Sequence, residues 1–490
     1  MSREPPPEVF VPRLPRPVRL LPRPRLRGTA SVFTTLTALA ATSLIGNPSV
    51  AEPFSAEPCA LARTAAHHSE GLDTWNAAYP RPARSLDAVM VFLSFPDWTP
   101  LPSPAELAAD HFPATSRFFE QASYGRFTLR SHPLKQWIRM PKPSTAYAIR
   151  RDWSPEGRAA YLHDALAAAD PHVDFSRYAV VYFVADPDAP GVDSDATKVV
   201  NLDDPLHADG TDIRRVVTVF EKHPPDRLVL AHETGHVFDL PDLYHRPVDG
   251  KGDWDTYVGD WDLMGSQFGL APDLFAWHKW KLGWLDPRQV LCLRKPGPTR
   301  LTLEPLAAAP GTPTAQALAR PPAAGSGEQA AQALGQPAPT PAQPPAPEVP
   351  APVQPAPAPV QPASAPPAPA RSAPVPGGGA RLAVVRTGPD SALAFEARGP
   401  VGNDRAACRA GILVYRVSSA ARSGRGPVEV LDAHPRTEAC WENSVYPPLA
   451  DAPVALGESF TVPGDGVRVD VESRSASGAW TLRITPRAKH

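Results

Sequence analysis

A segment rich in proline and alanine, residues 307–379, interrupts the chain and limits where a folded core can form. It holds a large share of the 65 prolines in the 490-residue sequence and few aromatic or β-branched side chains, as in APTPAQPPAPEVPAPVQPAPAPV. Such a segment cannot bury enough apolar surface to offset the entropy lost on folding. We therefore expect 307–379 to be an extended, polyproline-like, disordered insertion that acts as a solvated spacer.

The rest of the chain has the composition of a folded protein. Its length predicts two or three domains, and an overall hydrophobic content of 42% is enough for packed cores. The formal net charge is −2, which argues against a nucleic-acid surface or a polybasic membrane anchor. We expect no nucleic-acid partner, and the sequence leaves the oligomeric state open.

Residues 1–51 have the pattern of a signal peptide. An arginine-rich stretch from Arg3 to Arg27 precedes the uncharged run GTASVFTTLTALAATSLIG, and the small residues Ser49 and Ala51 suit a signal peptidase. The apolar run is short for a membrane span, and no stop-transfer pattern follows it. We predict secretion after cleavage behind Ala51, with no stable membrane anchor; a retained N-terminal anchor is the alternative.

Two folded regions are expected beyond this segment. Residues 52–85 are polar and are interpreted as a poorly ordered leader, a candidate propeptide, or an N-terminal strap. Residues 86–287 alternate between strand and helix patterns and predict an α/β (α+β) domain. Residues 288–306 and 380–490 show short strands of period two, which predict an all-β sandwich-like domain. The elements expected in the α/β domain are strands at 88–95, 178–186 and 214–220, a strand beginning near Phe127, and helices at 109–123, after Ser154 and from about Asp226.

The stretch LVLAHETGHVFDLPDLYH, residues 228–245, contains an H-E-x-x-H motif from His232 to His236. On a helix, positions i and i+4 share one face, so two imidazoles can bind one zinc ion with Glu233 beside them. Zinc lowers the pKa of a bound water molecule, and a carboxylate can take its proton as the water attacks a carbonyl. The preceding run DRLVL is apolar, as a buried active-site helix requires.

Two imidazoles leave zinc short of a third protein ligand. Asp242 occupies the third-ligand position of the extended pattern H-E-x-x-H-x-x-G-x-x-H/D. That pattern needs a sharp turn, usually at glycine, and here the turn position holds Asp239, a residue type that tolerates the left-handed conformation. Pro241 helps to end the helix. The rival third ligands are Asp239, His245, Asp255, Asp260 and Asp262.

A methionine turn follows in GDWDLMGS, residues 259–266, where Met264 is expected to form the apolar floor of the metal site. HETGHVFDLPDLY, GDWDLMGS and PDLFAWHKWKLGWLDP together resemble motifs of the M6 peptidases, the immune-inhibitor-A-like secreted metalloproteases of bacteria. The segments FFEQASYGRFTL and WIRMPKPSTAY are also similar to that family. Asp239 is the departure from its pattern, which has glycine there.

The resemblance implies a zincin/metzincin-like catalytic domain at 86–287 that holds one zinc ion and cleaves protein or peptide substrates. By motif position it makes His232, His236 and Asp242 the zinc ligands and Glu233 the catalytic base, above the Met264 turn. Tyr244 and Tyr257 are weaker candidates for stabilising an oxyanion. Members of the family often carry calcium, so Ca²⁺ is a second expected ion, with the acidic loops 186–195 and 249–262 as candidate sites.

The four cysteines, Cys59, Cys292, Cys408 and Cys440, have no C-x-x-C spacing and fit an exported protein. We favour the disulfides Cys59–Cys292 and Cys408–Cys440. The alternative for Cys59 is a thiolate that holds zinc in a latent proform.

The leading functional hypothesis is a secreted, extracellular bacterial zinc endopeptidase. A bacterial source is suggested by the high alanine, arginine and proline content. The alternative is a catalytically silent zincin-like domain that serves as a secreted surface or polymer binding module, and a zinc amidase or another hydrolase is a third hypothesis.

Overall fold

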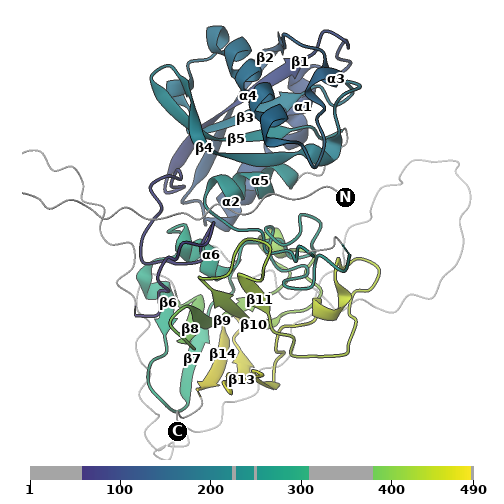
Figure 1. Cartoon of the computed structure of the whole chain (residues 1–490). Coiled ribbons are helices and arrows are strands. Elements are labelled where there is room, and N and C mark those ends of the chain that lie inside the picture. The colour runs from purple at the N-terminus through teal and green to yellow at the C-terminus, as the bar shows by residue number, and fades with distance from the viewer. Residues whose placement is uncertain (1–57, 223–227, 248–250, 308–378, 487–490) are drawn as a thin grey trace, which may run out of the picture. The chain divides into compact units, whose positions relative to one another are not determined.

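The structure is a computed structural model that describes residues 58–222, 228–247, 251–307 and 379–486. The predicted signal peptide and nearly all of the insertion lie outside the described residues, so those two predictions stay predictions. The described part is mixed α/β, with three sheets and mostly short helices (Figure 1). Within these ranges no helix is both long enough and apolar enough to cross a membrane.

The first sheet has the strand order β2-β1-β3-β5-β4. Strands β1, β2, β3 and β5 pair in parallel, whereas β4 pairs antiparallel to β5 and forms one edge. The strand bounds are β1 Ser85–Ser94, β2 Thr128–Arg139, β3 Val180–Ala185, β4 Lys198–Ala208 and β5 Thr211–Val219. The helices of this region are α1 Pro104–His111, α2 Ala114–Ala122, α3 Ser144–Tyr147, α4 Pro155–Ala169 and α5 Val229–Val237.

Alternate residues of β1 enter two different cores, because successive side chains of a strand point to opposite faces. Val89, Val91 and Leu93 share a buried cluster with residues of α4. Met90 and Phe92 belong to a second cluster that includes residues of α1, α2 and α5. The sheet is thus covered on both faces, as parallel sheets require, and α5 lies on the face opposite α4.

Two details differ from the sequence-based expectations. The single helix expected at 109–123 is divided into α1 and α2 at Pro113, because proline lacks an amide hydrogen and its ring disfavours helical geometry at the preceding residue. Strand β4 was not predicted at all. The pair Asp209-Gly210 in the sequence indicates a two-residue hairpin turn and could have revealed this strand. In the structure the pair connects β4 to β5, with φ of 49° and 70°.

The β-rich region contains two sheets, ordered β11-β10-β9-β8-β6 and β12-β13-β14-β7. Their facing side chains form one buried cluster that includes Phe395, Val414, Val469 and Leu482, as in the predicted sandwich. The bounds are β6 Val290–Cys292, β7 Thr299–Leu303, β8 Leu382–Arg386, β9 Ser391–Arg398, β10 Gly411–Ser418, β11 Val428–Val430, β12 Ser459–Thr461, β13 Arg468–Arg474 and β14 Trp480–Thr485.

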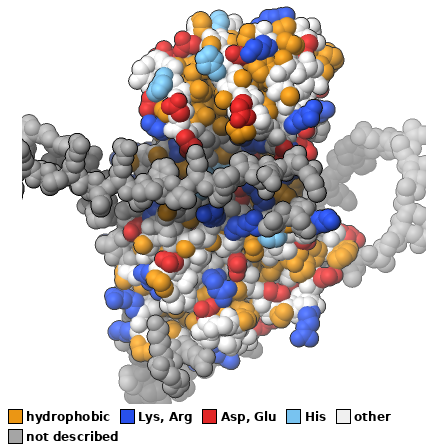
Figure 2. All heavy atoms as spheres, in the orientation of Figure 1, with side chains coloured by type: hydrophobic (Ala, Val, Ile, Leu, Met, Phe, Trp, Pro, Cys, Tyr) orange, Lys and Arg blue, Asp and Glu red, His pale blue; other side chains and the backbone are white. Residues whose placement is uncertain are grey.

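The sheet that contains β8, β9 and β10 is buried on both faces. Val384, Ala394 and Leu413 point away from the sandwich and join the same cluster as Met90 and helix α6, Ala276–Lys281. The chain therefore changes from the α/β region to the β-rich region near residue 287, and one buried cluster contains residues of both regions. The face drawn in Figure 2 carries acidic and basic side chains interspersed with apolar ones.

Residues 58–79, here named the strap, pack into this shared core. Leu61 and Leu72 are buried in the cluster, and Glu70 is fully buried beside α6. Of the two interpretations of residues 52–85, the described residues therefore fit the N-terminal strap and not the poorly ordered leader; that the segment is a propeptide stays a prediction. Polar residues here are buried because they find polar partners, which a sequence pattern does not display.

Both favoured disulfides are present, Cys59–Cys292 and Cys408–Cys440. Cys59 is consequently not a thiolate ligand for zinc. We expect a thiol-alkylating reagent to modify no cysteine in the denatured, unreduced protein and all four after reduction, as counted by mass spectrometry. Modification of any cysteine before reduction would contradict the pairing.

Candidate metal centre

Helix α5 carries the H-E-x-x-H motif, and every one of its residues is buried. It ends in a Schellman motif: Leu240 N–H donates to Gly235 O at 3.1 Å and Asp239 N–H donates to His236 O at 3.1 Å. This ending requires a left-handed residue, and Asp239 adopts it with φ of 65°. The chain then reverses at Pro241 and returns past the end of the helix with Asp242.

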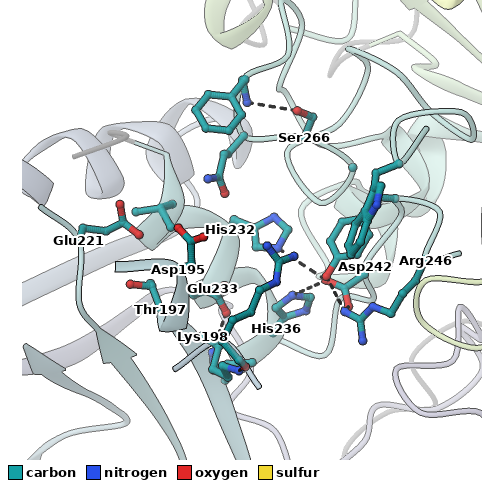
Figure 3. A pocket seen from close by; sticks show the side chains of 18 of the residues that line it. Asp195, Thr197, Lys198, Glu221, His232, Glu233, His236, Asp242, Arg246 and Ser266 are labelled. Carbon is teal, nitrogen blue, oxygen red and sulfur yellow. Dashed lines mark hydrogen bonds and ion pairs between the residues drawn. The ribbon is translucent and has the colours of Figure 1, made fainter. Parts of the chain in front are cut away.

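His232, His236 and Asp242 converge at one point (Figure 3). One ligand atom from each lies within 4.8 Å of the others. Asp242 Oδ1 is 2.9 Å from His236 Nε2 and 3.6 Å from His232 Nε2. These are three donors of the kind that zinc accepts, with room for a fourth.

The backbone fixes the orientation of both imidazoles. His232 Nδ1 donates to the carbonyl of Leu263 at 2.9 Å, and His236 Nδ1 donates to the carbonyl of Leu240 at 2.8 Å. A carbonyl can only accept, so each Nδ1 carries a hydrogen and each Nε2 is left as the ligand atom. The donor set therefore fits a zinc ion without rearrangement of the rings.

The electrostatics of the cluster also favour a cation. Burial opposes a charged imidazole at His236, but the Asp242 carboxylate outweighs burial and raises the pKa of His236 to about 9. Burial likewise opposes the Asp242 carboxylate, and attraction to His236 and His232 holds its pKa well below the ordinary value. A buried carboxylate that stays charged is neutralised either by a proton on an imidazole or by a bound metal ion.

Met264 lies under the helix as the sequence predicts. A Cβ atom at position 235 would lie 2.4 Å from Met264 Sδ, so any larger residue there would require the Met264 side chain to move. The backbone of the same turn supports the ligands: Leu263 O accepts from His232, and Met264 O accepts from Leu243 N–H at 2.9 Å. The methionine turn thus packs against helix α5 at Gly235 and orients the imidazole of His232.

Glu233 lies beside the cluster in a cavity of about 760 Å³ (Figure 3). Its Oε2 accepts a hydrogen bond from the backbone N–H of Val199 in β4, at 2.6 Å. This bond aims the carboxylate into the cavity and links the helix to the edge strand. Residues that line the cavity include Arg158, Asp195, Lys198, Glu221, Tyr244, Trp254, Ser266 and Phe268.

Asp242 is held from several sides. Ser423 Oγ donates to Asp242 Oδ2 at 3.0 Å and accepts from Asp242 N–H at 2.8 Å. Arg246 contacts the same carboxylate oxygen at 3.3 Å and donates to Tyr244 Oη at 2.6 Å. The carboxylate therefore presents Oδ1 to the imidazoles and Oδ2 to its supporting groups. Ser423 lies 181 residues from Asp242, and no local sequence signal indicates its role.

The rival ligands have other partners. Asp239 bonds to the strap, and His245 Nδ1 is 3.2 Å from Tyr257 Oη. Asp260 accepts from the Ser444 hydroxyl, and Asp262 is bonded to His278. None of these is grouped with the two imidazoles among the described residues. Asp255 lines the same cavity but is not grouped with them either, and burial together with nearby acids raises its pKa to about 6.

Of the two tyrosines, Tyr244 is the one near the cluster. Its ring centroid is 6.3 Å from that of His232.

Neither acidic loop gathers three metal-ligating side chains in the ranges described, so calcium remains a prediction without a site. A second group, Asp432, His434 and Asp451, does come together. His434 Nδ1 contacts the carbonyl of Asp451, and its Nε2 contacts Glu458. None of the three residues of this group lines the cavity that contains Glu233.

A scan against protein-family models and a comparison with curated proteins gave no match for this chain.

Proposed function

We propose that this protein is a secreted zinc-dependent endopeptidase with a zincin/metzincin-like catalytic domain of the M6 type. The observation that carries the proposal is the convergence of His232 Nε2, His236 Nε2 and Asp242 Oδ1 in an open cavity, with the Glu233 carboxylate beside them. Three ligands and a free coordination position are typical of catalytic zinc, whereas structural zinc is closed by four protein ligands.

Zinc, when bound, would acidify a water molecule and polarise a substrate carbonyl. The role of Glu233 follows from its position: it takes the proton of the attacking water and delivers it to the leaving amine. The Val199 N–H bond keeps the carboxylate of Glu233 aimed at the cavity. Tyr244, whose ring centroid is 6.3 Å from that of His232, is the candidate donor to the developing oxyanion.

The position of the edge strand β4 beside the cavity favours a polypeptide as the substrate. Strand β4 pairs with β5 on one side only, and Lys198 and Val199 at its start line the cavity. An edge strand offers unpaired backbone groups to an extended peptide, although the N–H of Val199 is already bonded to Glu233. A substrate that lies along β4 would pass beside Glu233 and the metal ligands, which favours cleavage within a chain.

The two disulfides support the proposed extracellular location, since such bonds form and persist in oxidising compartments. The extracellular role also rests on the signal-peptide pattern of residues 1–51.

The proposal is tested by metal content and casein cleavage of the purified secreted protein. We expect about one zinc per chain, casein cleavage, loss of cleavage after the zinc is removed with a chelator, and recovery on adding zinc. Zinc without cleavage would favour the binding-module alternative. Release of ammonia from amides without cleavage of internal peptide bonds would favour the amidase alternative.

A further inference from the structure

The segment that carries Asp242 has no regular structure of its own. Residues 238–247 follow α5 without forming a helix or strand, although Asp242 must be held firmly to act as a ligand. Metal ligands are oriented by the groups behind them, and loss of such a group commonly weakens metal binding. The contacts that hold residues 238–247 therefore decide whether the site is formed.

The strap holds the start of this segment through Asp239. The Asp239 side chain is fully buried, with Oδ1 3.0 Å from His68 Nδ1 and Oδ2 2.7 Å from Arg63 Nη2. The carbonyl of Asp239 accepts from Lys281 Nζ at 2.7 Å. The His68 ring also stacks on the ligand His236, with centroids 5.6 Å apart. Burial opposes the charged Asp239 carboxylate, and attraction to Lys281 together with the His68 hydrogen bond and the Arg63 charge keeps its pKa below the ordinary value. The strap thus supplies both side-chain partners in contact with this buried carboxylate.

The strap also holds the loop that supports Asp242. Thr64 Oγ1 and Ser69 Oγ both donate to the carbonyl of Ser419, at 2.5 Å and 2.7 Å. Four residues later the same loop supplies Ser423 to the Asp242 carboxylate and Gly424 N–H to the Asp242 carbonyl, at 2.9 Å. The strap thus reaches the ligand segment by two separate routes.

The strap is itself fixed at several points. Cys59 is bonded to Cys292, Ser69 O accepts from Lys281 Nζ at 2.8 Å, and Glu70 Oε1 is 2.8 Å from His278 Nε2. These anchors come from α6 and the β-rich region, so the strap joins the metal-binding helix to the rest of the core.

We infer that the strap is a permanent positioning element of the metal centre and is retained in the active protein. By holding Asp239 and the loop from Ser419 to Gly424, it keeps Asp242 at the two imidazoles. Arg63 and His68 are positioning residues, and their presence accounts for aspartate at a turn where the pattern H-E-x-x-H-x-x-G-x-x-H/D has glycine. The inference rests on the zinc site of the proposed function, not on the bond that is cut.

A double-mutant cycle on zinc affinity tests this inference. R63A/H68A and D239G are made separately and together in the full-length secreted protein, and zinc transfer to a chelator of known affinity is measured. We expect R63A/H68A to weaken zinc binding about 10–100-fold. In the D239G background, where no buried carboxylate needs partners, the same pair should change zinc affinity by no more than about threefold.

R130A/H132A is the matched control, because Arg130 and His132 both bond Asp87 at the protein surface. Zinc affinity should stay within about threefold of the parent, since exposed ion pairs contribute little. Equal effects of R63A/H68A in the parent and in the D239G background would overturn the inference, as would no effect in either. If R63A/H68A cannot be purified, rescue of the folded protein by D239G supports the same coupling and failure of rescue contradicts it.

The N-terminus of the active secreted protein provides an independent measurement. N-terminal sequencing should place it before Cys59, in a chain of unbroken mass after reduction. Active protein that has lost Arg63 and His68, with no strap peptide left on Cys292 when its mass is measured without reduction, would overturn the inference. These readouts separate the two proposals. Protein that binds zinc and shows the coupling but cleaves no polypeptide would end the endopeptidase proposal and leave the role of the strap standing.

Discussion

Glu233→Gln is expected to abolish casein cleavage while leaving the zinc content unchanged. Glutamine keeps the shape of the side chain and an oxygen that can accept from Val199 N–H, but it cannot take a proton from water. General-base catalysis contributes about 10²–10⁴-fold to rate, so we expect kcat to fall by at least about 10²-fold. The measurement is the initial rate of casein cleavage by parent and variant, each with its zinc determined.

Glu120→Gln is the control for this experiment, because Glu120 is an exposed glutamate on α2 and takes no part in the site. Its activity and zinc content should match those of the parent. If the Glu233 variant retained zinc and a tenth or so of parental activity, Glu233 would not be the base. If it lost zinc together with activity, its role would be in holding the metal centre together.

The grouping of His232, His236 and Asp242 could be predicted from the sequence because its determinants are local. His232 and His236 share a face through helical periodicity alone. Asp239 could be predicted to adopt a left-handed turn because helix endings follow a short backbone pattern, and the structure shows a Schellman motif there. Asp242 was then preferred over its rivals because it occupies the third-ligand position of the pattern H-E-x-x-H-x-x-G-x-x-H/D.

The groups that support the site could not be predicted in this way. Arg63 and His68 reach Asp239 from more than 170 residues away, and Ser423 reaches Asp242 from 181 residues away. Polar residues on a segment without periodicity have the same pattern whether they are solvated or paired in a core. The strap was therefore open to interpretation as a leader. Strand β4 was missed for a related reason: as an edge strand it is mostly half-buried or exposed and lacks a buried apolar run.

The buried network around His278 carries the second large expected effect. Its ring nitrogens lie 2.8 Å from Glu70 Oε1 and 3.1 Å from Asp262 Oδ2, and Lys281 Nζ is 3.6 Å from Glu70 Oε2. All four side chains are essentially inaccessible to solvent. Removing one partner of a buried ion pair is strongly destabilising, by about 3–5 kcal/mol. We expect Glu70→Gln to lower the free energy of unfolding by about 3 kcal/mol near pH 6.

Asp87→Asn provides the matched control, since Asp87 pairs with an arginine and a histidine at the surface. Its loss should cost less than about 1 kcal/mol. Urea unfolding of the parent and both variants, followed by tryptophan fluorescence, gives the comparison.

The effect of Glu70→Gln should also depend on pH with a definite sign. Burial opposes the charged ring of His278, but Glu70 and Asp262 outweigh it and raise its pKa to about 9. The unfolded chain has a histidine pKa of about 6.5, so this stabilisation is complete below about pH 6.5 and is lost as the pH rises through 9. Burial raises the pKa of Glu70, whereas Lys281 and His278 lower it below its ordinary value. Its contribution is therefore present above about pH 4.5 and falls in more acidic solution.

The difference in unfolding free energy between parent and Glu70→Gln should consequently be greatest between about pH 4.5 and 6.5 and smaller at pH 9.5. A difference that stays constant from pH 6 to pH 9.5 would show that His278 is not charged in the folded protein. Because Glu70 belongs to the strap and His278 to α6, the same measurement reports how strongly the strap is held against the core behind the metal centre. A strongly held strap is what its role in placing Asp242 requires, whereas a segment destined for removal would gain nothing from a buried charge network.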